Sequence, residues 1–296
     1  MDIRQLQFLC ALDRHRHFGR AAEACHVTQP TLSMRLRNLE DELGVTLIER
    51  RQRFEGFTAE GERLLSWAQQ AVNAFDGLKN EAHRLQGQLV GTLRIGMVPL
   101  SHIGLLPALR TLHLQAPNIR FQLQALSSQQ ILEQLENNQL DAGLTYLAQV
   151  EVKRYQVIPL GSPQVGLLGD AQYFPLLAEE GPLGWEALTR LPLGLLSEAM
   201  RFRQGLERSA RLQGIELNPL LESDAVEHLL EAAQAGLCCT LIPLPPPHAL
   251  PPSLTIRPLP QLVPQPALAL ACKQADGISN PLVQALLDSV RATQAR

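Results

Sequence analysis

The sequence lacks a long apolar run, since no segment has the about 18 consecutive apolar residues that a membrane-spanning helix requires. It also lacks a basic N-terminal stretch followed by an apolar one, the pattern of a secretory leader. We therefore exclude a helical membrane protein and expect a cytoplasmic protein without a membrane partner. A chain of 296 residues, 45% of them hydrophobic, suits a small domain joined to a larger two-lobed body.

Motifs that mark common enzyme classes are absent as well. The sequence has no GxSxG, HExxH or GxxxxGKS/T motif, and no GxGxxG that opens a helix. Glu222 and Asp224 resemble an acid–base pair, but no nucleophile or metal-ligand cluster accompanies them. We predict that the chain is not an enzyme and uses no cofactor or metal ion.

Cysteine is scarce. The five cysteines are an odd number and no two have CxxC spacing, which disfavours a disulfide framework. Cys10 and Cys25 fall on apolar faces of expected helices, and Cys238, Cys239 and Cys272 fall in expected strands. We expect all five to be core residues.

What the sequence does contain is a pair of short helices near its start. In the first helix, 18–25, Ala21 and Ala22 are small enough to let a second helix approach closely. Thr28 is a good N-cap and Pro30 fits a first turn, so the second helix begins at Gln29. Leucines at steps of four, three and four residues define its buried face: Leu32, Leu36, Leu39 and Leu43.

The N-terminal turn of this second helix suits a DNA major groove, because it is polar and carries the positive end of the helix dipole. After Gly44, the residues Val45, Leu47 and Ile48 predict a short strand, and residues 49–53 predict a basic wing tip that can reach phosphates. The alternative is a solvated charged turn on an ordinary helical domain. The predicted DNA contacts are Thr28, Gln29, Pro30, Thr31, Ser33, Met34, Arg35, Arg37, Arg50, Arg51 and Arg53.

Positive charge is not in excess in this region. Residues 1–60 contain nine Lys or Arg and nine Asp or Glu, and the whole chain has a formal net charge of −3. DNA affinity must therefore come from the local placement of the arginines rather than from a basic domain.

The N-terminal segment resembles the DNA-binding domain of LysR-type transcriptional regulators. The family pattern combines an aromatic residue, two alanines, Thr/Ser-Gln-Pro-x-Leu-Ser and Leu-Glu-x-x-Leu-Gly-x-x-Leu-Ile/Phe-x-Arg. Met34 departs from it, since an arginine is common there, and whether Met34 or Arg35 contacts bases stays open. The matching residues are Phe18, Ala21, Ala22, Thr28, Gln29, Pro30, Leu32, Ser33, Leu39, Glu40, Leu43, Gly44, Leu47, Ile48 and Arg50.

The resemblance implies a sequence-specific DNA-binding regulator controlled by a small-molecule effector. Its implied partners are double-stranded DNA, the effector and further copies of the chain in a homodimer or homotetramer, with RNA polymerase as another candidate. Peroxide-sensing members of the family carry a cysteine pair in the region corresponding to 197–211, where this chain has no cysteine. The alternative is a DNA-binding architectural or repressor protein that works without a ligand.

The implied fold class is a mixed α+β and α/β protein. It has an N-terminal winged helix-turn-helix at 1–58, a long coiled-coil linker helix at 59–88, and a two-lobed α/β effector domain similar to periplasmic binding proteins. The segment 59–86 has no proline and follows the N-cap Thr58, and apolar residues recur at alternating steps of four and three. The alternative is an amphipathic helix packed on its own chain. The predicted dimer seam is Leu64, Ala68, Ala71, Phe75, Leu78, Ala82 and Leu85.

Beyond Gly87, alternating strands and helices predict a parallel sheet. Ten prolines between Pro243 and Pro266 predict an extended crossing segment. We place lobe one at 91–161 and 267–296, and lobe two at 162–266. The expected strands are 89–98, 120–125, 141–146, 165–169, 193–196, 219–222, 238–242 and 268–272, and the expected helices are 104–115, 128–137, 200–213, 224–235 and 281–293.

In such folds ligands bind between the lobes, near strand ends where helix N-termini hold anions. A serine there is also an ordinary N-cap, and an arginine can simply face solvent, so both alternatives stay open. Only one of Arg201 and Arg203 can point inward if the two alternate, and it could hold a carboxylate in a fork. Residues 120–146 also resemble regulators of cyanate-degradation operons, which favours a small anion such as cyanate, formate or a short carboxylate. The candidate effector contacts are Pro99, Leu100, Ser101, Ser127, Ser128, Gln129, Tyr146, Ser197, Met200, Arg201, Phe202, Arg203 and Asp224.

Overall fold

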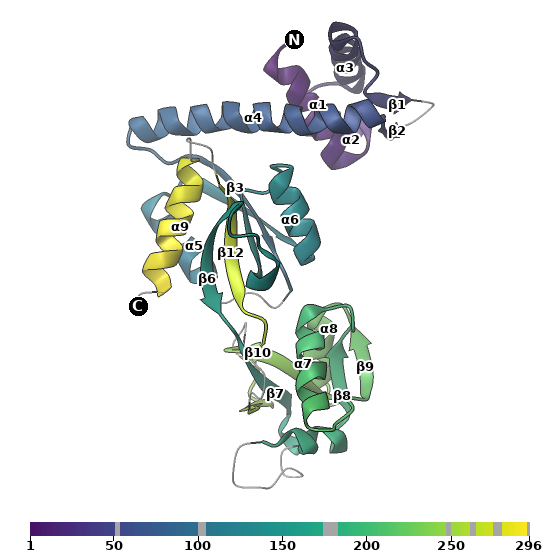
Figure 1. Cartoon of the computed structure of the whole chain (residues 1–296), viewed down its shortest axis with the longest axis vertical. Helices are drawn as coiled ribbons and strands as arrows, with labels where there is room; N and C mark the ends of the chain where they lie inside the picture. Colours follow the sequence, from purple (N-terminus) through teal and green to yellow (C-terminus); the bar gives the residue numbers. More distant parts are fainter. Residues whose placement is uncertain are drawn as a thin grey trace.

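The computed structural model describes residues 1–50, 54–99, 105–173, 183–246, 250–260, 265–274 and 280–294. Figure 1 shows an elongated molecule with a small head on one long helix, a first α/β lobe beside that helix, and a second lobe at the far end. The C-terminal helix lies with the first lobe, although the second lobe precedes it in the sequence. The predicted fold class is confirmed.

The head consists of α1 (Ile3–His15), α2 (Phe18–Ala24) and α3 (Gln29–Leu43), followed by the wing strands β1 (Ile48–Arg50) and β2 (Phe54–Phe57). The α3 helix begins as predicted, since the Thr28 hydroxyl accepts a hydrogen bond from the Thr31 amide at 3.4 Å. It ends at Gly44, whose φ of +66° is a left-handed conformation that glycine adopts at low cost.

Two details of the head differ from the prediction. Leu43 is 37% exposed, because it lies in the last turn of α3, beyond the reach of the core that buries Leu32, Leu36 and Leu39. Strand β1 starts only at Ile48, so that Val45 lies in the connection from α3.

The long helix α4 (Ala59–Leu85) begins against the wing. Its first residues are capped by Thr58, whose hydroxyl accepts from the Gly61 amide at 2.9 Å. Leu65 and Ala68 belong to the core of the head. Farther on, α4 leaves the head and runs along lobe one, where it contacts the C-terminal helix (Figure 1).

Lobe one is built on a sheet with the strand order β4-β3-β5-β12-β6. The parallel sheet predicted from the first three strands is confirmed, since β3 pairs in parallel with both β4 and β5. The strand predicted to return to this lobe, β12, is antiparallel to both β5 and β6. The chain enters β12 from the other lobe, which sets its direction, and β6 has no counterpart in the prediction. The elements are β3 (Gly91–Met97), α5 (Leu105–Gln115), β4 (Ile119–Ala125), α6 (Ser128–Glu136), β5 (Ala142–Tyr146), the 3-10 turn η1 (Leu147–Gln149), β6 (Tyr155–Gly161), β12 (Leu268–Lys273) and α9 (Pro281–Gln294).

Lobe two has a second mixed sheet, with the order β11-β7-β10-β8-β9. Strand β11 lies in the proline-rich segment, where only an extended crossing was expected; it is an edge strand, a position that tolerates proline. The short helix η3 was also not predicted. The elements are β7 (Gln164–Asp170), η3 (Trp185–Arg190), β8 (Leu193–Leu196), α7 (Arg201–Leu212), β9 (Pro219–Ser223), α8 (Val226–Gln234), β10 (Cys239–Leu244) and β11 (Leu254–Pro258).

Candidate functional site

The predicted DNA-contacting residues of α3 lie on one accessible side of the head. Thr31 and Ser33 are half-buried, and the exposed members are Thr28, Gln29, Pro30, Met34, Arg35 and Arg37. The hydroxyls of Thr28 and Thr31 are 2.8 Å apart. The first turn of α3 therefore presents polar side chains to solvent, as a helix that enters a DNA groove must.

The two arginines of α3 differ in their surroundings. Arg35 lies 3.4 Å from the carboxylate of Asp2, so this ion pair holds it toward the N-terminus of α1. Arg37 lines a groove of about 560 Å³ between α3 and the wing, together with Glu40, Thr46, Ile48, Glu49, Glu55 and Thr58. Met34 is 54% exposed.

Glu40 is occupied within the head rather than facing DNA. Its carboxylate accepts hydrogen bonds from the backbone amides of Leu47 at 2.9 Å and Ile48 at 3.1 Å. This contact ties the start of the wing to α3.

The wing is anchored by aromatic side chains. Phe54 makes edge contacts with Phe18 and Phe57, and the Arg16 guanidinium lies 5.5 Å from the centre of the Phe57 ring. Arg51 and Arg53 lie outside the described residues, as does the side chain of Arg50. Sequence reasoning missed Arg16, whose contacts connect residues far apart in the chain.

The predicted dimer seam divides into two parts. Leu64 and Ala68 pack against the head of the same chain. Phe75 is half-buried beneath Lys79, whose ammonium lies 4.4 Å from the ring centre. The exposed apolar residues of α4 include Trp67, Ala59 and Ala74, which the seam did not include, and the seam residues Ala71, Leu78, Ala82 and Leu85.

On lobe one, the candidate effector residues gather at the start of α6 and the end of β5. Ser127 is the N-cap of α6 and forms a capping box with Gln130, so its hydroxyl is engaged. Ser128 is buried, whereas Gln129 is exposed and bonds Glu133. Pro99 is half-buried at the end of β3, and Leu100 and Ser101 lie outside the described residues.

A polar bridge joins the two lobes at this point. With the amide oxygen of Gln149 facing Arg201, Gln149 Oε1 lies 2.6 Å from Arg201 Nη2, and Gln149 Nε2 donates to Ser128 Oγ at 2.9 Å. Burial raises the pKa of Tyr146 to about 12, and the positive charge of Arg201 opposes this shift. Ser128, Tyr146, Gln149 and Arg201 thus form one cluster, which we call the cleft cluster. Gln149, in η1, is the member that sequence reasoning missed.

The two arginines of lobe two take opposite roles. Arg203 is 1% exposed and donates to Glu207 at 2.7 Å, to Glu222 at 3.0 Å and to the Leu196 carbonyl at 3.0 Å. It is fully engaged within lobe two and is not free to bind an effector. Arg201 is exposed, and among the described residues no carboxylate lies within ion-pair distance of it.

The other candidates on lobe two serve its fold. Phe202 belongs to the core, and Met200 packs against it. Ser197 donates its amide to the Ser223 carbonyl at 2.9 Å, and Asp224 is exposed with no carboxylate-mediated contact among the described residues. None of these four residues has a hydrogen bond to a member of the cleft cluster among the described residues.

No helix in the described part of the chain is both long and apolar enough to cross a membrane. Within the same residues, no group of three His, Cys, Asp or Glu side chains is placed to hold a metal ion.

Comparison with known proteins gives two family matches. The model described as "Bacterial regulatory helix-turn-helix protein, lysR family" matches residues 3–62, and the model described as "LysR substrate binding domain" matches residues 86–295. The full-length OxyR variant from Pseudomonas aeruginosa has a similar structure, with a TM-score of 0.72, 28% identity and 98% coverage of both chains.

Two relatives are similar in sequence. The chain is 40% identical to the DNA-binding transcriptional dual regulator OxyR of Escherichia coli over 161 residues, covering 54% of this chain and 52% of that protein. It therefore matches about half the length of that relative. It is 32% identical to the hydrogen peroxide-inducible genes activator of Haemophilus influenzae over 240 residues, covering 80% of this chain and 79% of that protein. Because the two family models together span nearly all of the sequence, the chain belongs to the LysR family of bacterial helix-turn-helix transcriptional regulators.

Proposed function

We propose that this protein is a sequence-specific DNA-binding transcriptional regulator, controlled by a small anionic effector that binds between its two lobes. The DNA-binding part of this proposal rests on the exposed first turn of α3, which the wing flanks, in a chain of the LysR family. The protein is proposed to act in the cytoplasm and to catalyse no reaction.

A second copy of the chain is the proposed partner of α4. Four seam residues, Ala71, Leu78, Ala82 and Leu85, are exposed along the helix beyond the head, and exposed apolar side chains at heptad spacing favour helix pairing. Pairing would place two heads on one DNA site and multiply the phosphate contacts. This pairing would give a homodimer, and the family resemblance supports the further association of two dimers into a homotetramer.

Arg37 is the arginine of α3 for which we predict a phosphate contact, because it is exposed beside the wing and Arg35 is held by Asp2. In Arg37→Ala, the plot of log affinity against log salt should become shallower by about one unit per head. Fluorescence anisotropy with a duplex from upstream of the protein's own gene measures this slope.

The matched control for this prediction is Arg211→Ala, an exposed arginine on lobe two without a charged partner among the described residues. It should leave the slope unchanged. Equal slopes for Arg37→Ala and the unmodified protein would remove Arg37 from the DNA interface.

The effector half of the proposal is supported by Arg201. Arg201 supplies a positive charge in the cleft cluster, and the neutral Gln149 amide is its hydrogen-bond partner among the described residues there. An anion is a stronger partner for a guanidinium than a neutral amide is. We therefore propose cyanate, formate or a short carboxylate as the class of effector.

Anion binding should raise the thermal stability of the full chain. A ligand at about 100 times its dissociation constant adds about 2.7 kcal/mol to the free energy of unfolding. Differential scanning fluorimetry with cyanate, formate and acetate should detect this shift in the unmodified protein and in Arg211→Ala, but not in Arg201→Ala. A shift of the same size in Arg201→Ala would place the anion elsewhere, and no shift with any anion would favour a regulator without such a ligand.

Peroxide sensing is a second candidate, because the Haemophilus influenzae relative is a hydrogen peroxide-inducible genes activator. The cysteines of this chain argue against it. None lies between Cys25 and Cys238, and burial raises the pKa of Cys239 and of Cys272 to about 12. Thiols of this kind hold little of the thiolate that reacts with peroxide. An effector that binds in the cleft is the better-supported signal.

A further inference from the structure

One carboxylate in the head touches both the long helix and lobe one. Asp13, near the end of α1, is 7% exposed. Its Oδ2 accepts hydrogen bonds from Gln69 Nε2 of α4 at 3.2 Å and from Gln139 Nε2 of lobe one at 3.0 Å. Head, linker helix and body of the same chain therefore meet at a single side chain.

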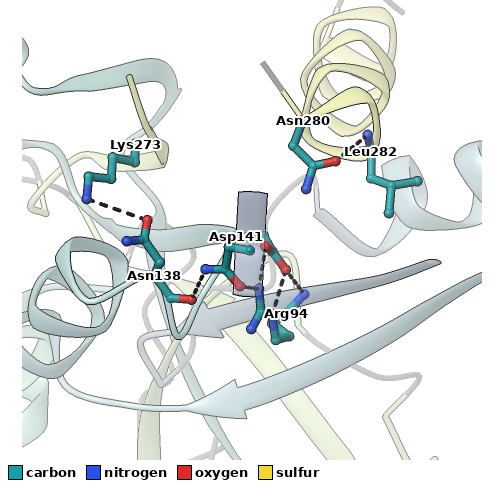
Figure 2. A network of polar contacts seen from close by, with 7 residues as sticks. Arg94, Asn138, Asp141, Lys273, Asn280 and Leu282 are labelled. Atoms are coloured by element: carbon teal, nitrogen blue, oxygen red, sulfur yellow. Dashed lines mark hydrogen bonds and ion pairs between the residues drawn. The ribbon is translucent and has the colours of Figure 1, made fainter. Parts of the chain in front are cut away.

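A second contact between α4 and lobe one involves Asn138, the residue before Gln139. Asn73 of α4 donates to the Asn138 carbonyl at 2.7 Å and accepts from Arg94 of β3 at 3.3 Å. Arg94 is paired with Asp141 through bonds of 2.9 and 3.0 Å. Figure 2 shows this pair next to Asn138, with Lys273 reaching toward the Asn138 side chain from the other side. The turn that contains Asn138 and Gln139 is thus fixed to α4 and to the sheet.

This turn directly follows α6, whose other end lies in the cleft cluster. Ser128, the first residue of α6, bonds Gln149, which in turn holds Arg201 of lobe two. A helix of 9 residues is about 13 Å long. The same short helix therefore has one end at the lobe boundary and the other at the head.

Helix α6 is packed closely on the sheet of lobe one. Ile131 and Leu135 are fully buried against the sheet. Gly143 of β5 leaves no spare room beneath the helix, since a Cβ there would lie 2.3 Å from Ile131. A close-packed helix that is shifted at one end transmits the shift to the other.

We propose that α6 couples the lobe boundary to the DNA-binding head within one chain, through the hydrogen bond between Gln139 and Asp13. The carboxylate of Asp13 also pairs with Arg16 at 2.8 Å, and Arg16 lies over Phe57 of the wing. A change in the cleft cluster thereby reaches the wing without a second subunit. The cleft end of this route rests on the proposed function, whereas the contact with the head does not.

Amide hydrogen exchange of the full chain tests the contact with the head. Gln139→Ala should speed exchange in the second half of α1 by about tenfold, the value of a hydrogen bond to a charged group, while α7 in lobe two stays unchanged. The matched control is Gln122→Ala, an exposed glutamine on β4 whose side chain has no hydrogen bond or ion pair among the described residues. Unchanged exchange in α1 of Gln139→Ala would overturn the proposal.

A swapped pair separates a specific contact from general destabilisation. Gln139→Glu places two carboxylates against each other and should speed exchange in α1 more than Gln139→Ala does. The double variant Gln139→Glu with Asp13→Asn again pairs one amide with one carboxylate, now with the two groups exchanged. The Gln69 amide would rotate so that its oxygen accepts from the new asparagine. Exchange in α1 should then return toward the original rate. Failure of the combination to restore the rate would also overturn the proposal.

Arg201→Ala tests the cleft end of the route. By releasing Gln149 and Ser128 it should change exchange in the turn 137–141 and in α1, both far from the substitution. A change confined to lobe two would refute coupling through α6 while leaving the head contact in place. DNA binding and anion-dependent stability are measured separately on the same variants, so failure of the proposed function is distinguishable from failure of the coupling.

Discussion

Arg203→Ala is expected to lower the free energy of unfolding of lobe two by about 3 kcal/mol, which would make it one of the most damaging substitutions in the effector domain. Arg203 is 1% exposed, and its guanidinium joins Glu207, Glu222 and the Leu196 carbonyl. Alanine would leave a buried carbonyl without its donor and two carboxylates without their cation, in addition to a cavity.

Urea unfolding followed by fluorescence of the buried Trp185 in lobe two measures this loss. Arg211→Ala on the same helix is the control and should change stability by less than about 0.5 kcal/mol, because an exposed side chain without an ion pair to any described residue contributes little. Arg203→Lys keeps the positive charge but loses the planar guanidinium that donates to several acceptors at once. Its loss of unfolding free energy should therefore fall between those of Arg203→Ala and Arg211→Ala. If Arg203→Ala were as stable as Arg211→Ala, Arg203 would return to the list of candidate effector contacts.

The contrast between Arg201 and Arg203 also marks the limit of prediction from this sequence. The pattern shows that two arginines near the start of a helix must face different ways, but not which one faces inward. That depends on Glu222 at the end of β9 and on the Leu196 carbonyl at the end of β8, which only the folded sheet brings together. No local sequence pattern therefore predicts these contacts.

Elements with strong local signals were predicted well. The N-cap Thr28 and the leucine spacing placed α3, and Thr58 placed the start of α4. The parallel pairing of β3, β4 and β5 was predicted correctly, whereas the antiparallel direction of β12 and the strand β6 were not predicted. The direction of β12 follows from how the chain passes between the lobes rather than from any residue pattern. The contact of Asp13 with Gln139 joins positions separated by 126 residues, and the bridging role of Gln149 likewise depends on the lobe boundary.

A glycine in the first turn of α4 gives the second large prediction. Gly61 lies against the wing connection, where an added Cβ would be 2.1 Å from the carbonyl oxygen of Leu47. The oxygen cannot retreat easily, because it accepts the Thr58 amide at 3.0 Å. Gly61→Ala should therefore cost about 3 kcal/mol of stability despite the gain of about 1 kcal/mol in helix propensity. Thermal unfolding of the full chain measures the loss.

Gly77→Ala is the matched control, since it lies in the same helix and an added Cβ meets nothing within 4 Å. It should raise stability by about 0.5–1 kcal/mol, so the two substitutions are expected to have opposite signs. The destabilisation expected for Gly61→Ala also has a consequence for DNA binding. If α4 and the wing cannot pack, the head loses its fixed angle to the linker helix, and Gly61→Ala should weaken DNA binding even below its unfolding temperature. Stability equal to that of Gly77→Ala would mean that the wing and α4 separate freely, and the head could not be positioned by the linker helix.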